Sequence, residues 1–264
     1  MQKSRLLILA LALVALVMFP ASLFAHDMWA SAVDPAAGKP LRLSIGYGHD
    51  FPNPEPIPAE ELPFFQVKLV GPSGEIPITA DSSKNYEWVT NGPVEAGSYV
   101  FLSDVKPIFW SQTPDGWAMK PKNEAKGATS CGYFIEGAKG VINVGKPGNP
   151  DLVGKPVGMP IEIVPKSNPA SVKPGGTLGL TVYLDGKPVS GVKVEGRYAG
   201  FDKLVGSPEA RAFVSVTDAK GEVNFVPLAA GAWIIKATAE RPYADTKACD
   251  KTEYGTSLYF TVAK

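Results

Sequence analysis

Short segments that alternate apolar and polar residues, separated by turns, recur along this 264-residue chain from residue 41 to its end. Such alternation is typical of strands with one buried face, because successive side chains of a strand point to opposite sides. Glycine (27 residues) and proline (25 residues) supply the turns. Long amphipathic helical patterns are absent beyond residue 25. The sequence therefore predicts an all-β fold.

The strand segments fall into two groups, which predict two domains. The first, residues 26–157, is expected to be an N-terminal β-sandwich-like domain; its strands are predicted over 41–47, 64–70, 86–89 and 98–102. The second, residues 158–264, carries about seven short strands at regular spacing, the pattern of an immunoglobulin-like β-sandwich. Trp233 is expected to fill its core. A short helix is compatible with residues 124–138, although Gly127 and Gly132 would weaken it.

The first 25 residues have the parts of a secretory signal peptide: a basic start, an apolar run over residues 6–18, and small residues that end at Ala25. The run is shorter than the roughly 20 residues that span a bilayer, which favours cleavage over a retained anchor. No cysteine follows it that would carry a lipid anchor. We expect an exported, periplasmic protein that begins at His26, with cleavage after Ala21 as the alternative.

Two cysteines, Cys131 and Cys249, are present. In an exported chain an even count favours a disulfide, which here would join the two predicted domains. A thiolate metal site is the weaker interpretation, because structural zinc sites need more Cys or His partners than this pair offers.

Charge and motif content argue against several classes of function. The 26 basic and 26 acidic residues balance, so no electrostatic footprint for nucleic acid or an anionic membrane is visible. The chain also lacks the nucleophile elbow, the phosphate-binding loop and the zinc-protease helix motif. We therefore expect a protein that is not an enzyme.

The two histidines, His26 and His49, are the candidate metal ligands. Cleavage after Ala25 would give His26 a free α-amine beside its ring Nδ1, and these two nitrogens close a compact chelate ring. The amine has an ordinary pKa of about 7.7–8.0, so a metal ion displaces its proton at modest cost. Amine and imidazole nitrogens suit nickel, cobalt, copper and zinc. Both histidines could instead be incidental surface residues.

Further ligands are less clearly marked. Asp27 and Asp50 are favoured among the nearby acids because each adjoins a histidine, and each could also orient an imidazole ring; the other acids considered are Glu55, Glu60 and Glu61. Most such carboxylates are solvated surface groups. Core packing is the expected role of the nearby sulfur and aromatic side chains, namely Met28, Met119, Trp29, Tyr47, Trp110 and Trp117.

The segments around both histidines resemble a known family, the periplasmic nickel-uptake accessory proteins (the nickel uptake substrate-specific family, otherwise of unknown function). These segments are residues 26–29 (HDMW) and 48–52 (GHDFP); shorter matches lie at 113–117, 138–145, 185–189, 217–221 and 231–233. The resemblance implies a periplasmic protein that delivers Ni(II) or Co(II) to a membrane transporter component. It carries a metal-binding role onto His26 and His49 only.

The sequence therefore supports three hypotheses. The leading one is a metal carrier for Ni(II) or Co(II), in which the proline-rich loop after His49 covers the site. The second is a copper histidine-brace protein, either a Cu(II) chaperone or an oxidative enzyme. The third is a structural or adhesion module of two β-sandwiches in which neither histidine binds metal.

Overall fold

The computed structural model describes residues 26–57, 59, 61–81, 84, 86–207 and 210–264. The predicted signal peptide, its cleavage position and Glu60 lie outside the described residues. Within these residues, no helix has the length and apolar content needed to span a bilayer.

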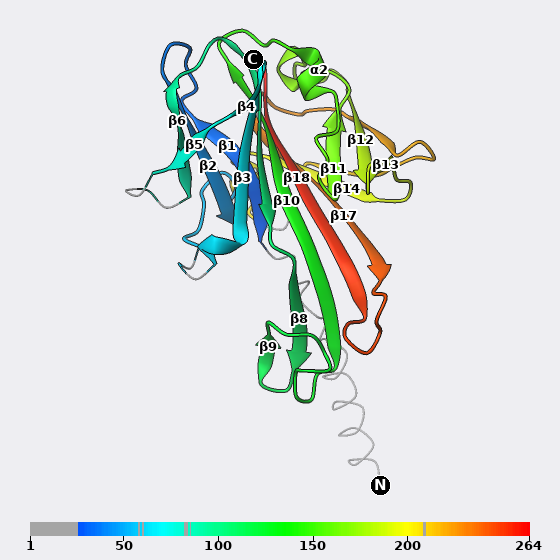
Figure 1. Ribbon diagram of the computed structural model, residues 1–264. Helices are drawn as coiled ribbons and strands as arrows, with labels where there is room; N and C mark the ends of the chain where they lie inside the picture. Colours follow the sequence, from blue (N-terminus) through cyan, green and yellow to red (C-terminus); the bar gives the residue numbers. More distant parts are fainter. Residues whose placement is uncertain (1–25, 58, 60, 82–83, 85, 208–209) are drawn as a thin grey trace.

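Strands dominate the described chain and form three sheets (Figure 1). The N-terminal sheet has the order β1 (Asp27–Val33), β2 (Pro40–Gly48), β6 (Glu87–Pro93), β5 (Ile78–Ala80). The C-terminal sheet contains β11 (Ile161–Pro165), β12 (Leu178–Leu184), β13 (Lys187–Pro188) and β16 (Glu222–Phe225).

The largest sheet, here called the shared sheet, crosses the whole molecule. Its order is β15 (Phe213–Val216), β14 (Lys193–Tyr198), β17 (Gly231–Pro242), β18 (Lys251–Val262), β10 (Ser130–Val144), β7 (Gly97–Val105), β3 (Phe65–Gly71), β4 (Gly74–Ile76). Strand β8 (Ile108–Thr113) joins the free part of β10 and carries β9 (Gly116–Ala118). Short helical turns connect the strands: η1 (Leu62–Phe64), α2 (Pro150–Val153), η2 (Pro169–Ser171) and α3 (Phe201–Val205).

The two smaller sheets pack against opposite faces of the shared sheet. Alternation along β10 shows this, because Ala138 and Ile142 belong to the core under the N-terminal sheet, whereas Val141 belongs to the core under the C-terminal sheet. On β18, Leu258 and Phe260 likewise lie in the C-terminal core. Two sandwiches thus share one sheet, which confirms the predicted all-β class with an N-terminal sandwich-like domain and a C-terminal immunoglobulin-like sandwich.

Pairing between β10 and β18 joins the two halves. These strands run parallel, from Gly132 opposite Lys251 to Gly140 opposite Tyr259, and the sheet is continuous across the join. The domain boundary between residues 157 and 158 remains a prediction. Trp233 is fully buried in the C-terminal core, as expected.

The helix considered for residues 124–138 is wrong: residues from Ser130 onward form β10. Farther along the same strand, a glycine permits close packing of two sheets. A Cβ at Gly140 would lie 1.9 Å from the carbonyl oxygen of Ala30, so only glycine lets β1 approach β10 this closely.

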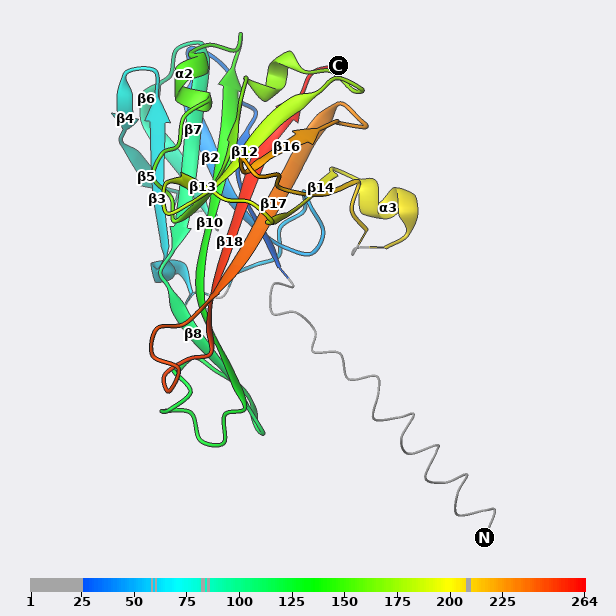
Figure 2. The same ribbon diagram turned by 90° about the vertical axis from the view of Figure 1, so that its right-hand side faces the viewer.

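An arm made of β8, β9, the first half of β10 and the adjoining ends of β17 and β18 projects beyond both sandwiches (Figures 1 and 2). The predicted disulfide is confirmed and lies here: Cys131 at the start of β10 is bonded to Cys249 just before β18. Such a bond is typical of exported proteins in oxidising compartments. At the tip, Trp117 and Met119 are 45% and 44% exposed, so the core role expected for them is wrong.

Candidate metal centre

Strand register brings the two histidines together. Strands β1 and β2 are antiparallel neighbours, and Asp27 pairs with Gly48. His26 immediately precedes Asp27 and His49 immediately follows Gly48, so the two lie opposite each other at the end of the ladder. Their rings meet nearly edge to face, with centroids 4.3 Å apart. A second ring, Tyr47, lies 4.6 Å from the His26 ring.

Glu55 completes a cluster with the two histidines. Its backbone N–H donates to the carbonyl of Tyr47 (2.7 Å), which folds the loop back onto β2. Its Oε1 accepts the backbone N–H of His49 (2.8 Å) and lies 2.9 Å from His49 Nδ1. Its Oε2 lies 3.7 Å from His26 Nε2. One ligand atom from each of the three residues lies within 4.8 Å of the others, close enough to hold one metal ion.

Gly48 permits this return of the loop. Its φ of +132° lies in the region that disfavours side chains, and a Cβ there would lie 2.7 Å from Glu55 Cγ. The loop is also anchored by Phe51, whose buried ring packs edge to face against Trp29 at 5.2 Å. Trp29 in turn occupies the space left by Gly46, where a Cβ would lie 1.9 Å from the indole ring.

The electrostatics of the cluster favour a neutral His26 and an ionised Glu55. Partial burial lowers the pKa of His26 and the neighbouring His49 lowers it further, while Glu55 acts in the opposite direction. Hydrogen bonds from the backbone N–H and the ring of His49 lower the pKa of Glu55. The side chains of His26, His49 and Glu55 are 36%, 39% and 45% exposed. The cluster therefore offers nitrogen lone pairs and a carboxylate at the protein surface.

Asp27 has a different position from the one expected of a ligand. Its carboxylate is buried, and its oxygens are held by Arg197 of β14 and by Lys236 of β17, the latter at 2.5 Å. These partners come from the second half of the chain, so Asp27 fastens the residue next to His26 onto the shared sheet.

Asp50 and Glu61 also lie outside the three-residue cluster. Asp50 Oδ2 accepts a hydrogen bond from the amide of Asn53 within the loop (3.1 Å). Met28 is buried in the N-terminal core, in keeping with a packing role.

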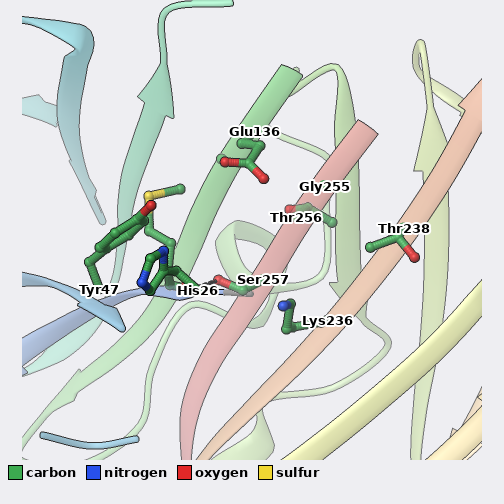
Figure 3. Close-up of a pocket in the computed structure, with 10 residues that line it drawn as sticks. His26, Tyr47, Glu136, Lys236, Thr238, Gly255, Thr256 and Ser257 are labelled. Atoms are coloured by element: carbon green, nitrogen blue, oxygen red, sulfur yellow. Dashed lines mark hydrogen bonds between the residues drawn. The ribbon is translucent and has the colours of Figure 1, made fainter. Parts of the chain in front are cut away.

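A small polar cavity of about 40 Å³ adjoins His26 (Figure 3). Tyr47 borders it on the side of β2, and Glu136, Lys236 and Thr238 border it from the shared sheet. Burial raises the pKa of Tyr47 to about 12. Burial also raises the pKa of Glu136, and the Lys236 ammonium acts against that rise.

Sequence reasoning missed Arg197, Lys236 and Glu136, which surround the site from strands far along the chain. No local motif marks them. Glu55 was considered, but it was placed behind Asp27 and Asp50 because it does not adjoin a histidine in sequence.

Solved structures similar to this chain are modular β proteins at low similarity. A two-domain fibronectin type-III segment of chicken tenascin is 12% identical, covering 89% of this chain and 97% of that one, with a TM-score of 0.24. The adhesin InvE of Yersinia pseudotuberculosis is 14% identical over 90% of this chain and 59% of that one, with a TM-score of 0.21. The D0-D1 domain of intimin is 13% identical over 89% and 97%, also at 0.21. At these scores the likeness carries no argument about function.

A search among curated proteins gives no match. A family model does match: the domain of unknown function DUF4198 aligns with residues 23–241, which include both histidines, Glu55 and most of the shared sheet. This protein therefore belongs to the DUF4198 family.

Proposed function

We propose that this protein binds a divalent transition-metal ion through His26, His49 and Glu55, and that it carries Ni(II) or Co(II) to a membrane uptake system without catalysing a reaction. The observation that carries the proposal is the convergence of three ligand atoms, from three separate places in the sequence, within 4.8 Å of one another. The resemblance of segments 26–29 and 48–52 to nickel-uptake accessory proteins supports the choice of metal and partner.

The donor set fits this class of ion. Two imidazole nitrogens and one carboxylate oxygen are the ligands that nickel, cobalt, copper and zinc share. Cleavage after Ala25 would add the α-amine of His26 as a further donor. By the Irving–Williams order Cu(II) would bind most tightly in a test tube, so selection of Ni(II) or Co(II) rests on which metal is available in the compartment.

Two roles are open to Glu55 within this site. The His26 nitrogen that faces Glu55 is Nε2. If Nε2 binds the metal, Glu55 is a ligand. If the metal is chelated by the α-amine and Nδ1 of His26, Nε2 is free to donate a hydrogen bond to Glu55, which then orients the ring.

A carrier must release its metal ion, and the cluster suits release. All three side chains are partly exposed, so a ligand from an acceptor can approach the bound ion directly. The proline-rich loop contributes Glu55 to the cluster and is anchored by Phe51, and it leaves the three side chains partly exposed.

The test begins with the mature protein purified from the periplasm. Mass spectrometry identifies its first residue, and calorimetric titration with Ni(II), Co(II), Cu(II) and Zn(II) follows. We expect a chain that begins at His26 and binds Ni(II) with a sub-micromolar dissociation constant. His49→Ala should weaken binding at least tenfold. Glu75→Gln is the matched control, since Glu75 is an exposed carboxylate that forms an ion pair with Lys68 away from the site.

Glu55→Gln separates the two roles of Glu55. Glutamine keeps an acceptor oxygen for the His26 ring but is a poor metal ligand, so a loss of tenfold or more identifies a ligand and a small loss identifies an orienting group. A chain that begins at Ser22 and binds none of the four metals would contradict the carrier proposal and leave the structural-module hypothesis. Cu(II) binding with redox turnover would favour the histidine-brace hypothesis.

A further inference from the structure

The cavity beside His26 has a size that limits what can enter it. Its volume is about 40 Å³, and one water molecule needs roughly 10–15 Å³ of such space. About three or four water molecules, or a comparable number of heavy atoms from a larger ligand, therefore fit. His26 forms one wall of the cavity, whereas His49 and Glu55 do not line it, so a ligand placed there would approach an ion held by the cluster from the His26 side.

The opposite wall is charged, and its charges come from neighbouring strands of the shared sheet. Lys236 of β17 is paired with buried Asp27, which also holds Arg197. These three groups carry one net positive charge. Glu136 of β10 is the acidic side chain among the described residues that line the cavity, and Figure 3 shows it directed toward the space between His26 and Lys236. An ionised Glu136 brings the net charge of these four groups to zero.

A metal dication in the cluster would favour the ionised form of Glu136, because a nearby opposite charge stabilises a carboxylate against the effect of burial. The carboxylate would then repel an anion that enters the cavity and accept hydrogen bonds from a neutral ligand such as water or an imidazole N–H.

We propose that this cavity is the position at which an exchangeable ligand reaches the bound metal, and that Glu136 selects neutral donors over anionic ones. The inference rests on the proposed metal site and deepens it. It implies that the acceptor of the metal presents a neutral nitrogen donor, a histidine imidazole, rather than a carboxylate or a thiolate. Glu136 is in this sense a positioning residue and not a metal ligand.

The experiment uses the mature protein loaded with one equivalent of Cu(II) as a spectroscopic probe. Azide and imidazole are titrated separately, and the Cu(II) absorption and paramagnetic resonance spectra report their binding. In Glu136→Gln we expect azide to bind about five to ten times more tightly than in the wild type, the size expected for removing one charge at short range from a half-buried site. Imidazole affinity should change by less than twofold.

Two variants control the result. Glu136→Asp keeps the charge and should bind azide as the wild type does. Glu253→Gln removes another half-buried carboxylate from β18, one paired with Lys251 and outside the cavity, and should leave azide affinity within twofold. Thermal melting of each variant shows that it is folded.

Two results would overturn the inference while leaving the metal site in place: normal Cu(II) binding with equal azide affinity in wild type and Glu136→Gln, or an equal gain in Glu253→Gln. If the wild-type protein itself does not bind Cu(II), the proposed function is overturned instead. The two failures are thus distinguished by the metal titration that precedes the ligand titrations.

Discussion

Two polar clusters lie on opposite faces of β10 and differ sharply in exposure. On one face, Lys139 and Glu162 form a 2.6 Å ion pair that is almost completely buried. Glu162 also accepts the backbone N–H groups of Val157 and Gly158. On the other face, His26, His49 and Glu55 form a cluster whose side chains are each more than one third exposed.

The two clusters differ in whether their polar atoms are available to bind a ligand. The carboxylate oxygens of Glu162 already accept hydrogen bonds from protein groups, so they are not available to a ligand. The ion pair instead fixes the segment around residue 157 onto the shared sheet. The histidine cluster is held mainly through backbone contacts and through neighbours such as Asp27, and its nitrogens remain accessible. A buried charge pair thus serves the fold, whereas a similar set of charges at the rim can serve binding.

The largest effect should come from breaking the buried pair. Glu162→Ala leaves the Lys139 ammonium buried without its partner, and burial already lowers the pKa of Lys139. We expect a loss of about 3–5 kcal/mol in the free energy of unfolding, measured by urea denaturation. Metal affinity of the remaining folded protein should be unchanged. The double variant Lys139→Met/Glu162→Leu should recover most of the loss, and a failure to recover would show that the hydrogen bonds to residues 157 and 158 matter more than the charges.

Replacing Asp27 tests whether a buried charge also helps to position the metal site. Asp27→Asn keeps the shape but removes the buried negative charge that Arg197 and Lys236 share, which should cost about 2–3 kcal/mol of stability. Because Asp27 adjoins His26, metal affinity should fall as well, in contrast to Glu162→Ala. Urea denaturation and calorimetric titration of the same preparation check both. Unchanged metal affinity would mean that His26 is positioned independently of this anchor.

Gly48→Ala should weaken the metal site with only a small effect on the fold. The added Cβ would meet Glu55 Cγ and would force a side chain to adopt a φ of +132°. We expect about a tenfold loss of metal affinity and a stability cost of about 1–2 kcal/mol. Gly74→Ala is the matched control, since Gly74 has a similar φ of +115° and open space around it. Equal effects on metal affinity would show that backbone strain, and not the displacement of Glu55, is responsible.

The sequence allowed part of this site to be predicted. His26 and His49 were paired because they are the two histidines and one follows a strand, but their contact depends on the register of β1 and β2, which alternation alone does not reveal. Adjacency to histidine favoured Asp27 and Asp50, yet the Asp27 carboxylate is held by Arg197 and Lys236 of the shared sheet. The Asp50 carboxylate accepts a hydrogen bond from Asn53 within its own loop. The loop that returns Glu55 depends on Gly48 and on a hydrogen bond to Tyr47.

The fold, like the site, could be predicted from the sequence only in part. Alternation predicted the two sandwiches and the buried Trp233. It could not reveal that β10 and β18 pair in parallel, because that pairing joins segments more than a hundred residues apart. The supposed helix over residues 124–138 was wrong because the chain from Ser130 onward pairs with β8, β7 and β18, a tertiary cause that local propensity does not include.

The smallest expected effect is the pH dependence that His26 gives to the metal-free protein. Burial and His49 lower its pKa in the folded state below the ordinary value of 6.5. Well above pH 6.5 the ring is neutral in both states and adds no pH dependence. Below 6.5 the unfolded chain takes up a proton that the folded protein resists, so stability falls as the solution is acidified until the folded-state pKa is passed. Glu55, whose pKa is also lowered, adds a further loss of stability only below about pH 4.5.

Urea denaturation between pH 7.5 and 5 with a chelator should therefore show a shallower decline of stability in His26→Gln than in the wild type. Parallel declines would indicate that His26 protonates equally well in both states, and that the histidine cluster is more solvated than its partial burial indicates.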